Sequence, residues 1–303
     1  MQRLLIVGSG DVARRAVTWL AQRFRVFALV RPEGQPANDW RALGACPVAG
    51  DLDQPQSLAR LAGLADRVLH LAPPQATGAK DVRTRHLLAA LSRSGILPRR
   101  LVYVSTTGVY GDCGGARIDE TQPRRPHSAS ARRRLDAENC LRRWGSAHRV
   151  SVVLLRAPGI YATKDRNGAG ERLPRARLEA GLPVPFAAED VHSGHIHADD
   201  LARACCRALF LGGAGRSFNV VDASDLKMGD YFDAVADCLR LPRPPRCSRA
   251  DLQQRIPPAQ WRFWQESRRV ENTRLAREMR LRLLYPQIDL NPLNPVSQES
   301  GKK

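Results

Sequence analysis

Lysine is scarce in this sequence of 303 residues, which carries a formal net charge of +18. Only five of its 48 basic residues are lysines, so arginine supplies almost all of the positive charge. The basic residues are spread evenly, with six to nine in each of the first five blocks of fifty. A nucleic-acid surface gathers its basic residues in a patch or stripe, so we expect no nucleic-acid partner.

The sequence also has no pattern typical of a membrane span, a signal peptide, a cysteine-based site or a nucleic-acid-binding motif. No apolar run reaches the roughly 18 residues of a membrane span, and the short N-terminal apolar run has no signal-peptide cleavage site. The seven cysteines include no C-x-x-C pair, and their odd number favours reduced thiols. No RNP-type aromatic motif or zinc-finger spacing is present. These absences predict a cytoplasmic protein without a membrane partner.

Apolar strands and helical patterns alternate regularly along the chain. The predicted strands are 3–8, 25–30, 46–52, 67–74, 100–107, 150–161 and 217–222, and the predicted helices are 11–24, 57–64, 82–95, 131–145, 197–213 and 228–245. Continuous apolar strands between helices are typical of a parallel sheet that is covered on both faces. The predicted fold class is α/β, a doubly wound parallel sheet of the Rossmann type.

The alternation weakens after residue 161, which predicts a second, smaller unit. We expect a dinucleotide-binding Rossmann domain over 1–165, with 195–222 returning to it. Residues 166–194 and 223–290 are expected to form a small C-terminal substrate lobe. The tail at 291–303 is rich in Pro, Asn and Ser and is expected to be disordered.

The clearest motif is VGSGDVA, between the first strand and the first helix. Gly8 permits the tight turn, Gly10 lets a pyrophosphate approach the backbone, and Ala13 allows close helix–strand packing. The helix N-terminus at Asp11 and Val12 offers N–H groups and a positive dipole to phosphate. The pattern predicts a dinucleotide site, in which Asp11 either lies near the phosphates or caps the helix.

The end of the second strand distinguishes two cofactors. An acidic residue there would bind the ribose 2′-hydroxyl of NAD, whereas Arg31 suits the 2′-phosphate of NADP. We expect NADP, and the nearby Glu33 keeps NAD open. The other predicted cofactor residues are Asp51 and Leu52 after the third strand and Leu71 and Ala72 at the end of the fourth.

The fifth strand runs into VYVSTTGVYGDCGG at 102–115. This ending resembles the extended short-chain dehydrogenase/reductases of the NAD-dependent epimerase/dehydratase type, in which Ser and Thr residues precede a Tyr-Gly pair. RAPGIYA at 156–162, HIHADDLARA at 195–204 and the segment at 217–239 are similar to the same family in order and spacing. The resemblance covers nearly the whole chain, and it implies an NAD(P)-dependent oxidoreductase.

Active members of this family carry Tyr-x-x-x-Lys on the next helix, followed by a glutamate. The tyrosine moves the proton, while an earlier Ser or Thr hydroxyl binds the substrate oxygen. The resemblance gives Thr106 this hydroxyl role. Counting back from Glu138, Arg134 occupies the lysine position and Ser130 the tyrosine position. The chain therefore resembles an atypical member whose catalytic positions are Thr106, Ser130 and Arg134.

Neither replacement can perform the usual proton transfer. A serine hydroxyl is a much poorer proton donor than a phenol, and arginine has a pKa above about 12. Thr107, Tyr110 and Tyr161 are expected to contact the substrate. Tyr110, Tyr161 or His127 could take over from the missing tyrosine, and the alternative for each is packing or loop structure.

The same helix contains three consecutive arginines at 132–134. Because arginine is abundant throughout the chain, we interpret Arg132 and Arg133 as a solvated helix face. Helices near 80–95 and 130–145 often form the dimer interface of the family, which implies a homodimer.

Three histidines form the pattern H-x-x-H-x-H at His192, His195 and His197. Histidine suits zinc, but the resemblance explains this segment as structure, and we expect no metal.

Two functional hypotheses remain. The first is an NAD(P)-dependent oxidoreductase, similar to epimerases and dehydratases, that acts on a small carbonyl, alcohol or sugar-derived substrate with altered acid–base residues. The second is a non-catalytic NAD(P)-binding sensor, assembly factor or scaffold. The intact Thr106 segment favours the first hypothesis, and the Ser130 and Arg134 pair favours the second.

Overall fold

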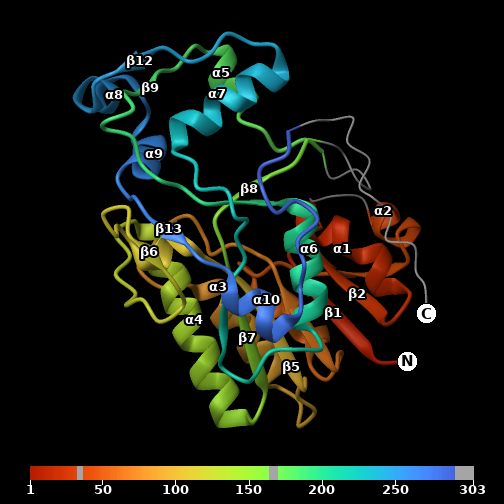
Figure 1. Ribbon diagram of the computed structural model, residues 1–303. Helices are drawn as coiled ribbons and strands as arrows, with labels where there is room; N and C mark the ends of the chain where they lie inside the picture. The colour runs from red at the N-terminus through yellow and green to blue at the C-terminus, as the bar shows by residue number, and fades with distance from the viewer. Residues whose placement is uncertain (33–36, 164–169, 291–303) are drawn as a thin grey trace.

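A seven-stranded parallel sheet organises the larger part of the molecule (Figure 1). The structure is a computed structural model, and it describes residues 1–32, 37–163 and 170–290. The strand order is β11-β7-β5-β4-β1-β2-β3. These strands are β1 (Arg3–Val7), β2 (Arg25–Val30), β3 (Ala45–Ala49), β4 (Arg67–His70), β5 (Arg100–Thr106), β7 (Ser151–Ala157) and β11 (Ser217–Asn219). The doubly wound α/β fold class is confirmed.

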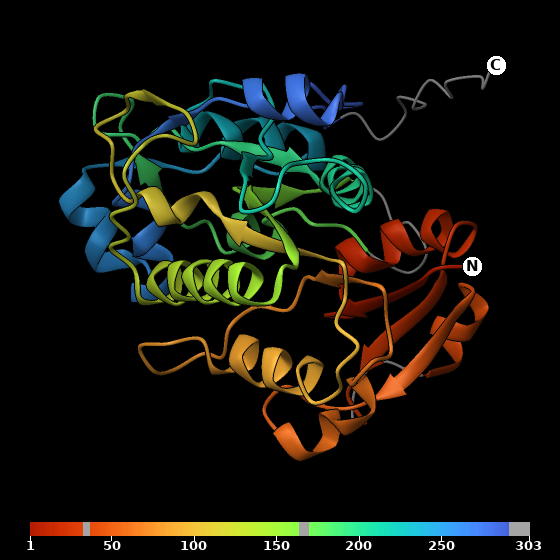
Figure 2. The same cartoon turned by 90° about the horizontal axis from the view of Figure 1, so that it is seen from below.

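Helices cover both faces of this sheet, because its strands present apolar side chains in both directions. In β1, Leu4 and Ile6 enter one core cluster, and Leu5 and Val7 enter the other. The first face carries α1 (Asp11–Ala21), α2 (Ala37–Ala42), α6 (Ala198–Ala208) and α10 (Thr273–Met279). The second carries η1 (Pro55–Leu61), α3 (Val82–Leu91) and α4 (Ala129–His148), and Figure 2 shows α3 and α4 side by side beneath the sheet.

A smaller lobe lies beyond the carboxyl ends of the strands, at the top of Figure 1. Its apolar cluster includes Leu178, Phe232 and Trp264. Its elements are α5 (Arg175–Glu179), β9 (Val184–Pro185), α7 (Met228–Leu239), β12 (Arg246–Cys247), α8 (Arg249–Arg255), α9 (Pro258–Trp261) and η3 (Arg262–Trp264). The remaining short elements are η2 (Thr107–Tyr110) and two strand pairs: β6 (Arg117–Ile118) with β13 (Arg269–Val270), and β8 (Gly159–Tyr161) with β10 (His195–His197).

Several predicted boundaries differ from the structure. The helix expected at 57–64 is the 3₁₀ helix η1, which starts at Pro55 and gives way to extended backbone at Ala62. The helix expected at 228–245 ends at Leu239, because Arg240 adopts the left-handed conformation that terminates helices.

Within 195–222, α6 covers the sheet and β11 joins its edge, whereas β10 pairs with β8 outside it. The predicted tail at 291–303 and Glu33 lie outside the described residues. None of the helices in the described ranges is long and apolar enough to cross a membrane.

Candidate functional site

The glycine turn after β1 leaves an open cradle at the start of α1. Gly8 has a φ of +100°, and a Cβ there would lie 2.4 Å from the backbone nitrogen of Ala72, so the turn requires glycine. A Cβ at Gly10 would meet no protein atom within 4 Å, so packing does not require this glycine. Gly10 is also the N-cap of α1 and makes no side-chain cap hydrogen bond. Open space in front of an uncapped helix N-terminus fits a phosphate group.

A groove of about 560 Å³ extends from this cradle along the carboxyl ends of β1 to β4. Every predicted cofactor residue lines it. These residues are Gly8, Gly10, Asp11, Val12, Ala13, Arg31, Asp51, Leu52, Leu71 and Ala72. They meet because parallel strands place the loops that follow them at the same edge of the sheet. Arg83 and Arg172 also line the groove, and no motif had marked them.

The charged residues of the groove favour an anionic ligand. Asp11 is not the helix cap, because Gly10 holds that position. Its carboxylate accepts a hydrogen bond from Arg15 Nε at 3.0 Å and lies 3.6 Å from Arg172 Nη1, so its negative charge is offset. Arg31 is exposed and has no carboxylate within 4 Å among the residues that the structure describes, which leaves its charge available.

A second cleft, of about 900 Å³, lies between the sheet and the lobe. Four of the predicted catalytic and substrate residues line this cleft: Thr106, Thr107, Ser130 and Arg134. The groove and the cleft share the lining residues Pro73, Arg134, Ile160 and Arg172. A cofactor in the groove and a substrate in the cleft would therefore meet beside Arg134.

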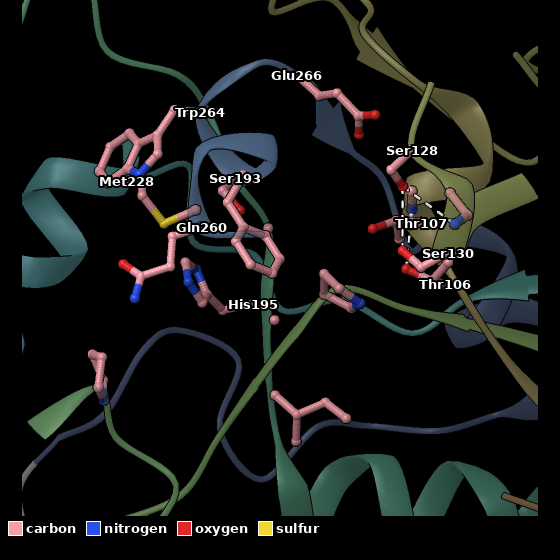
Figure 3. A pocket seen from close by; sticks show the side chains of 18 of the residues that line it. Thr106, Thr107, Ser128, Ser130, Ser193, His195, Met228, Gln260, Trp264 and Glu266 are labelled. Carbon is pink, nitrogen blue, oxygen red and sulfur yellow. Dashed lines mark hydrogen bonds between the residues drawn. The ribbon is translucent and has the colours of Figure 1, made fainter. Parts of the chain in front are cut away.

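Four hydroxyl groups gather at one end of the cleft (Figure 3). Thr106 Oγ1 accepts a hydrogen bond from a backbone N–H of η2 at 3.1 Å. Ser128 Oγ caps α4 and lies 3.3 Å from Ser130 Oγ, where either hydroxyl can donate. Thr107 completes the group. These side chains can position a substrate oxygen, but none of them is an efficient acid or base at neutral pH.

Arg134 is fixed at the junction of the two cavities. Its Nη1 donates to the Val104 carbonyl at 2.6 Å and to Tyr103 Oη at 3.1 Å. Burial raises the pKa of Tyr103 to about 12, although the Arg134 charge acts in the opposite direction. This phenol stays protonated at neutral pH, and Arg134 supplies a permanent positive charge rather than a proton.

Glu138 anchors α4 to the sheet behind the hydroxyl groups. It is fully buried and accepts hydrogen bonds from Arg156 Nε at 3.0 Å, Arg156 Nη2 at 2.8 Å and Ser105 Oγ at 2.7 Å. Burial acts to raise the pKa of Glu138, but the hydrogen bonds from Arg156 and Ser105 outweigh burial and hold the pKa below its usual value. This network fixes the position of the helix that carries Ser130 and Arg134.

Two predicted substrate residues do not line the cleft. Tyr110 is buried, and its hydroxyl donates to Asn219 Oδ1 at 2.7 Å while accepting from Arg156 Nη1 at 2.8 Å. Tyr161 is also buried, and its hydroxyl accepts from the Asp289 backbone N–H at 3.2 Å. Both hydroxyls are engaged inside the protein, and the substrate contact of these two tyrosines stays a prediction. His127 is exposed and lines neither cavity.

Arg133 requires a correction. The sequence predicted a solvated residue, yet Arg133 is only 7% exposed, lines the cleft and donates from Nη1 to the Gly78 carbonyl at 2.9 Å. Arg132 is exposed as expected. Arg133 lies three residues after Ser130, a spacing that places both side chains on one helix face. That spacing was the signal in the sequence that could have identified it.

Aromatic side chains form the lobe side of the cleft. His195 stacks on Tyr231 with ring centres 4.0 Å apart, and Phe232 stacks on Trp264 at 5.9 Å. Burial lowers the pKa of His195 to about 4, so this ring is neutral at physiological pH. These four rings carry no charge at physiological pH, which suits the carbon skeleton of a substrate, and Arg177 lies over the Phe232 and Trp264 rings.

The remaining histidines of H-x-x-H-x-H occupy different surroundings. His197 stacks on Tyr285, and its Nδ1 accepts the Asp199 backbone N–H at 3.1 Å at the start of α6. His192 lies 3.5 Å from Asp225. Within the described part of the chain, no group of three or more His, Cys, Asp or Glu side chains could hold a metal ion.

Comparison with known proteins relates this geometry to a family. Residues 5–221 match the sequence profile described as NAD dependent epimerase/dehydratase family. GDP-6-deoxy-D-mannose reductase of Pseudomonas aeruginosa is 26% identical over 262 residues, which cover 78% of this chain and 80% of the reductase.

Two solved structures illustrate the structural similarity. A conserved protein of unknown function from Silicibacter pomeroyi has 26% identity and a TM-score of 0.72, with 95% of each chain covered. UDP-glucose 4-epimerase of Thermotoga maritima, solved with UDP-glucose, has 18% identity and a TM-score of 0.73, with 93% of this chain and 94% of the epimerase covered.

Proposed function

The chain belongs to the NAD dependent epimerase/dehydratase family, and on that premise we propose that it is an NAD(P)-dependent oxidoreductase with altered acid–base residues. Its substrate is a small carbonyl, alcohol or sugar-derived compound that binds between the sheet and the lobe. NADP is the preferred cofactor, because Arg31 lines the groove where a 2′-phosphate would lie.

The observation that carries this proposal is the junction of the two cavities. The groove begins at the open cradle of Gly10 and ends at Arg134, where the cleft with Thr106 and Ser130 begins. A dinucleotide bound along the groove supplies a hydride donor or acceptor at its nicotinamide end. The substrate in the cleft is held next to that end.

The residues of this chain position the reactants more than they move protons. The hydroxyl of Thr106 holds the substrate oxygen, and Ser130 and Ser128 extend that contact. Arg134 places a fixed positive charge beside the reacting oxygen, which stabilises developing negative charge. Without a phenol at position 130, a positioned general acid worth about 10²–10⁴ in rate is missing. The proton then comes from solvent or from the substrate itself, and turnover is slow.

The relatives support a carbonyl or alcohol substrate. The P. aeruginosa protein is named as a reductase of a deoxysugar nucleotide, and the T. maritima enzyme binds UDP-glucose. Redox change at an alcohol or carbonyl carbon is common to such reactions, and we extend that class of chemistry, without the particular sugar, to this protein.

A non-catalytic role as an NAD(P)-binding sensor, assembly factor or scaffold is the second candidate. The specific observation in its favour is that the groove holds every predicted cofactor residue, while Ser130 and Arg134 stand where the family's proton-transferring tyrosine and lysine are expected. In this case NADPH binding persists, but no substrate of the class is turned over.

Two measurements test these proposals. Fluorescence titration with NADPH and NADH should show binding of at least one cofactor, and binding of neither would refute both candidates. Absorbance at the nicotinamide band should then reveal slow turnover with a panel of carbonyls, alcohols and sugar nucleotides. Loss of that turnover in Thr106→Ala supports the oxidoreductase proposal. Tight NADPH binding without turnover of any compound in the panel favours the non-catalytic sensor.

A further inference from the structure

Arg133 differs from the other buried arginines in lacking an anionic partner. Three arginine residues are buried in the described structure, at 5%, 7% and 2% exposure for Arg14, Arg133 and Arg156. Arg14 pairs with Asp39 at 3.0 Å, and Arg156 pairs with Glu138 at 2.8 Å. No described carboxylate lies within 4 Å of Arg133, and its buried Nε makes no hydrogen bond.

Burying an uncompensated charge is costly, so such a charge usually has a partner. Among the described residues, the Arg133 guanidinium makes one hydrogen bond, from Nη1 to the Gly78 carbonyl at 2.9 Å. Of its five N–H donors, Nε–H is buried, and the remaining three, on Nη1 and Nη2, are left for another group. Since Arg133 lines the 900 Å³ cleft, the missing anion can come from a ligand in that cleft.

Five arginines and two glutamates line the cleft, and one of the glutamates, Glu171, pairs at 3.2 Å with Arg175 outside it. Arg268 pairs with Glu266 at 2.6 Å, and Arg172 lies 3.6 Å from Asp11. Arg134 and Arg177 line the cleft as well, and neither has a carboxylate within 4 Å in the described ranges. The cleft thus carries an excess of positive charge around its ligand space, which favours an anionic occupant.

The N-terminus of α4 adds to the positive potential in the cleft. Ser128, Ser130 and Ala131 line the cleft, so the positive end of this 20-residue helix faces it. The Ser128 hydroxyl caps one N–H, at Ala131, and Ser130 of the same first turn also lines the cleft. An anion beside Arg133 would be attracted both by the charge of the guanidinium and by the positive end of the helix dipole.

We propose that Arg133 and the N-terminal turn of α4 bind a carboxylate or phosphate group of the substrate, close to the carbon that reacts. This inference rests on the proposed function, in which Thr106 and Ser130 hold the reacting oxygen. Ser130 and Arg133 are about one helical turn apart, or roughly 5 Å along the axis. The substrate is therefore a compact hydroxy acid, oxo acid or phosphate ester, whose anionic group and alcohol or carbonyl are only a few bonds apart.

The test compares matched anionic and neutral probes by isothermal titration of the full chain saturated with NADPH. Lactate is compared with lactamide, and glycerol 3-phosphate with glycerol, so that the two arms distinguish a carboxylate from a phosphate. The variants are Arg133→Gln, Arg133→Lys and the matched control Arg132→Gln, which removes the same charge from the exposed face of α4.

In the wild type and in Arg132→Gln, at least one anionic probe should bind tenfold or more tightly than its neutral partner. Arg133→Gln should abolish this preference, and Arg133→Lys should retain part of it. Equal affinity for charged and neutral probes in the wild type would overturn the proposal, as would an anion preference that survives in Arg133→Gln.

NADPH titration of the same samples separates this inference from the proposed function. Retained NADPH binding with no anion preference overturns only the assignment of Arg133. An anion preference that depends on Arg133 without any NADPH or NADH binding supports the anion site and overturns the oxidoreductase.

Discussion

Replacing Asp222 with asparagine is expected to stabilise the protein increasingly as the pH rises from 5 to 8. Asp222 is only 3% exposed. Its Oδ1 accepts the Ser224 backbone N–H at 3.0 Å, whereas its Oδ2 is buried without a hydrogen-bond partner. Burial raises the pKa of this carboxyl from 3.8 to about 7, against the contribution of Ser224. The folded protein therefore holds a proton that the unfolded chain releases.

The sign and the size of the effect follow from proton linkage. Between pH 4 and 7 the folded state binds more protons than the unfolded state, so stability falls as the pH rises through this window. A shift of about three pKa units corresponds to about 4 kcal/mol at most, at 1.36 kcal/mol per unit. This is a substantial part of the 5–15 kcal/mol that is typical of whole proteins. An asparagine keeps the contact with Ser224 but cannot ionise.

Urea unfolding of the wild type and Asp222→Asn at pH 5, 6, 7 and 8 measures the difference directly. The free energy of unfolding of the variant should exceed that of the wild type by an amount that grows with pH and levels off above about pH 7. Asp225→Asn is the control, because this neighbouring carboxylate is 38% exposed and makes screened ion pairs worth under about 1 kcal/mol. A stability difference for Asp222→Asn that stays constant from pH 5 to 8 would refute the reasoning.

Three further predictions follow from the site. Arg31→Gln should weaken NADPH binding by about tenfold or more and leave NADH binding unchanged, as measured by fluorescence titration, because only NADPH presents a 2′-phosphate. Glu138→Gln should lower the free energy of unfolding by about 3–5 kcal/mol in urea, since it leaves the buried Arg156 without its carboxylate. The double variant Ser130→Tyr with Arg134→Lys should raise kcat for an accepted substrate by about 10²–10⁴, and an unchanged kcat would argue against the assigned positions.

The groove at the carboxyl ends of β1 to β4 could be predicted from the sequence because its geometry is local. A glycine turn, a strand end and the first turn of a helix are adjacent in the chain, and parallel topology brings successive strand ends to one edge. Gly8 and Gly10, Arg31 and Ala72 therefore meet in the groove as expected.

The orientation of the two tyrosines could not be predicted from the sequence, for the opposite reason. Whether Tyr110 faces the cleft or the interior depends on Asn219 and Arg156, which come from β11 and β7. Tyr161 is held by the backbone near Asp289, more than a hundred residues away. Resemblance to a motif identifies the segment that such a tyrosine belongs to, but the direction of its hydroxyl is decided by partners that are remote in sequence.

Arg133 shows what helix geometry adds to a motif. Counting back from Glu138 gives position 134 as the lysine position of the family motif and position 130 as the tyrosine position. On a helix of 3.6 residues per turn, position 133 lies about 60° from position 130 and about 40° from Ala137, whose side chain is fully buried. Placing Ser130 at the site therefore already places Arg133 on a neighbouring part of the same side of α4. A run of three arginines on such a helix cannot be uniformly solvated, and its buried member, Arg133, lines the cleft together with Arg134.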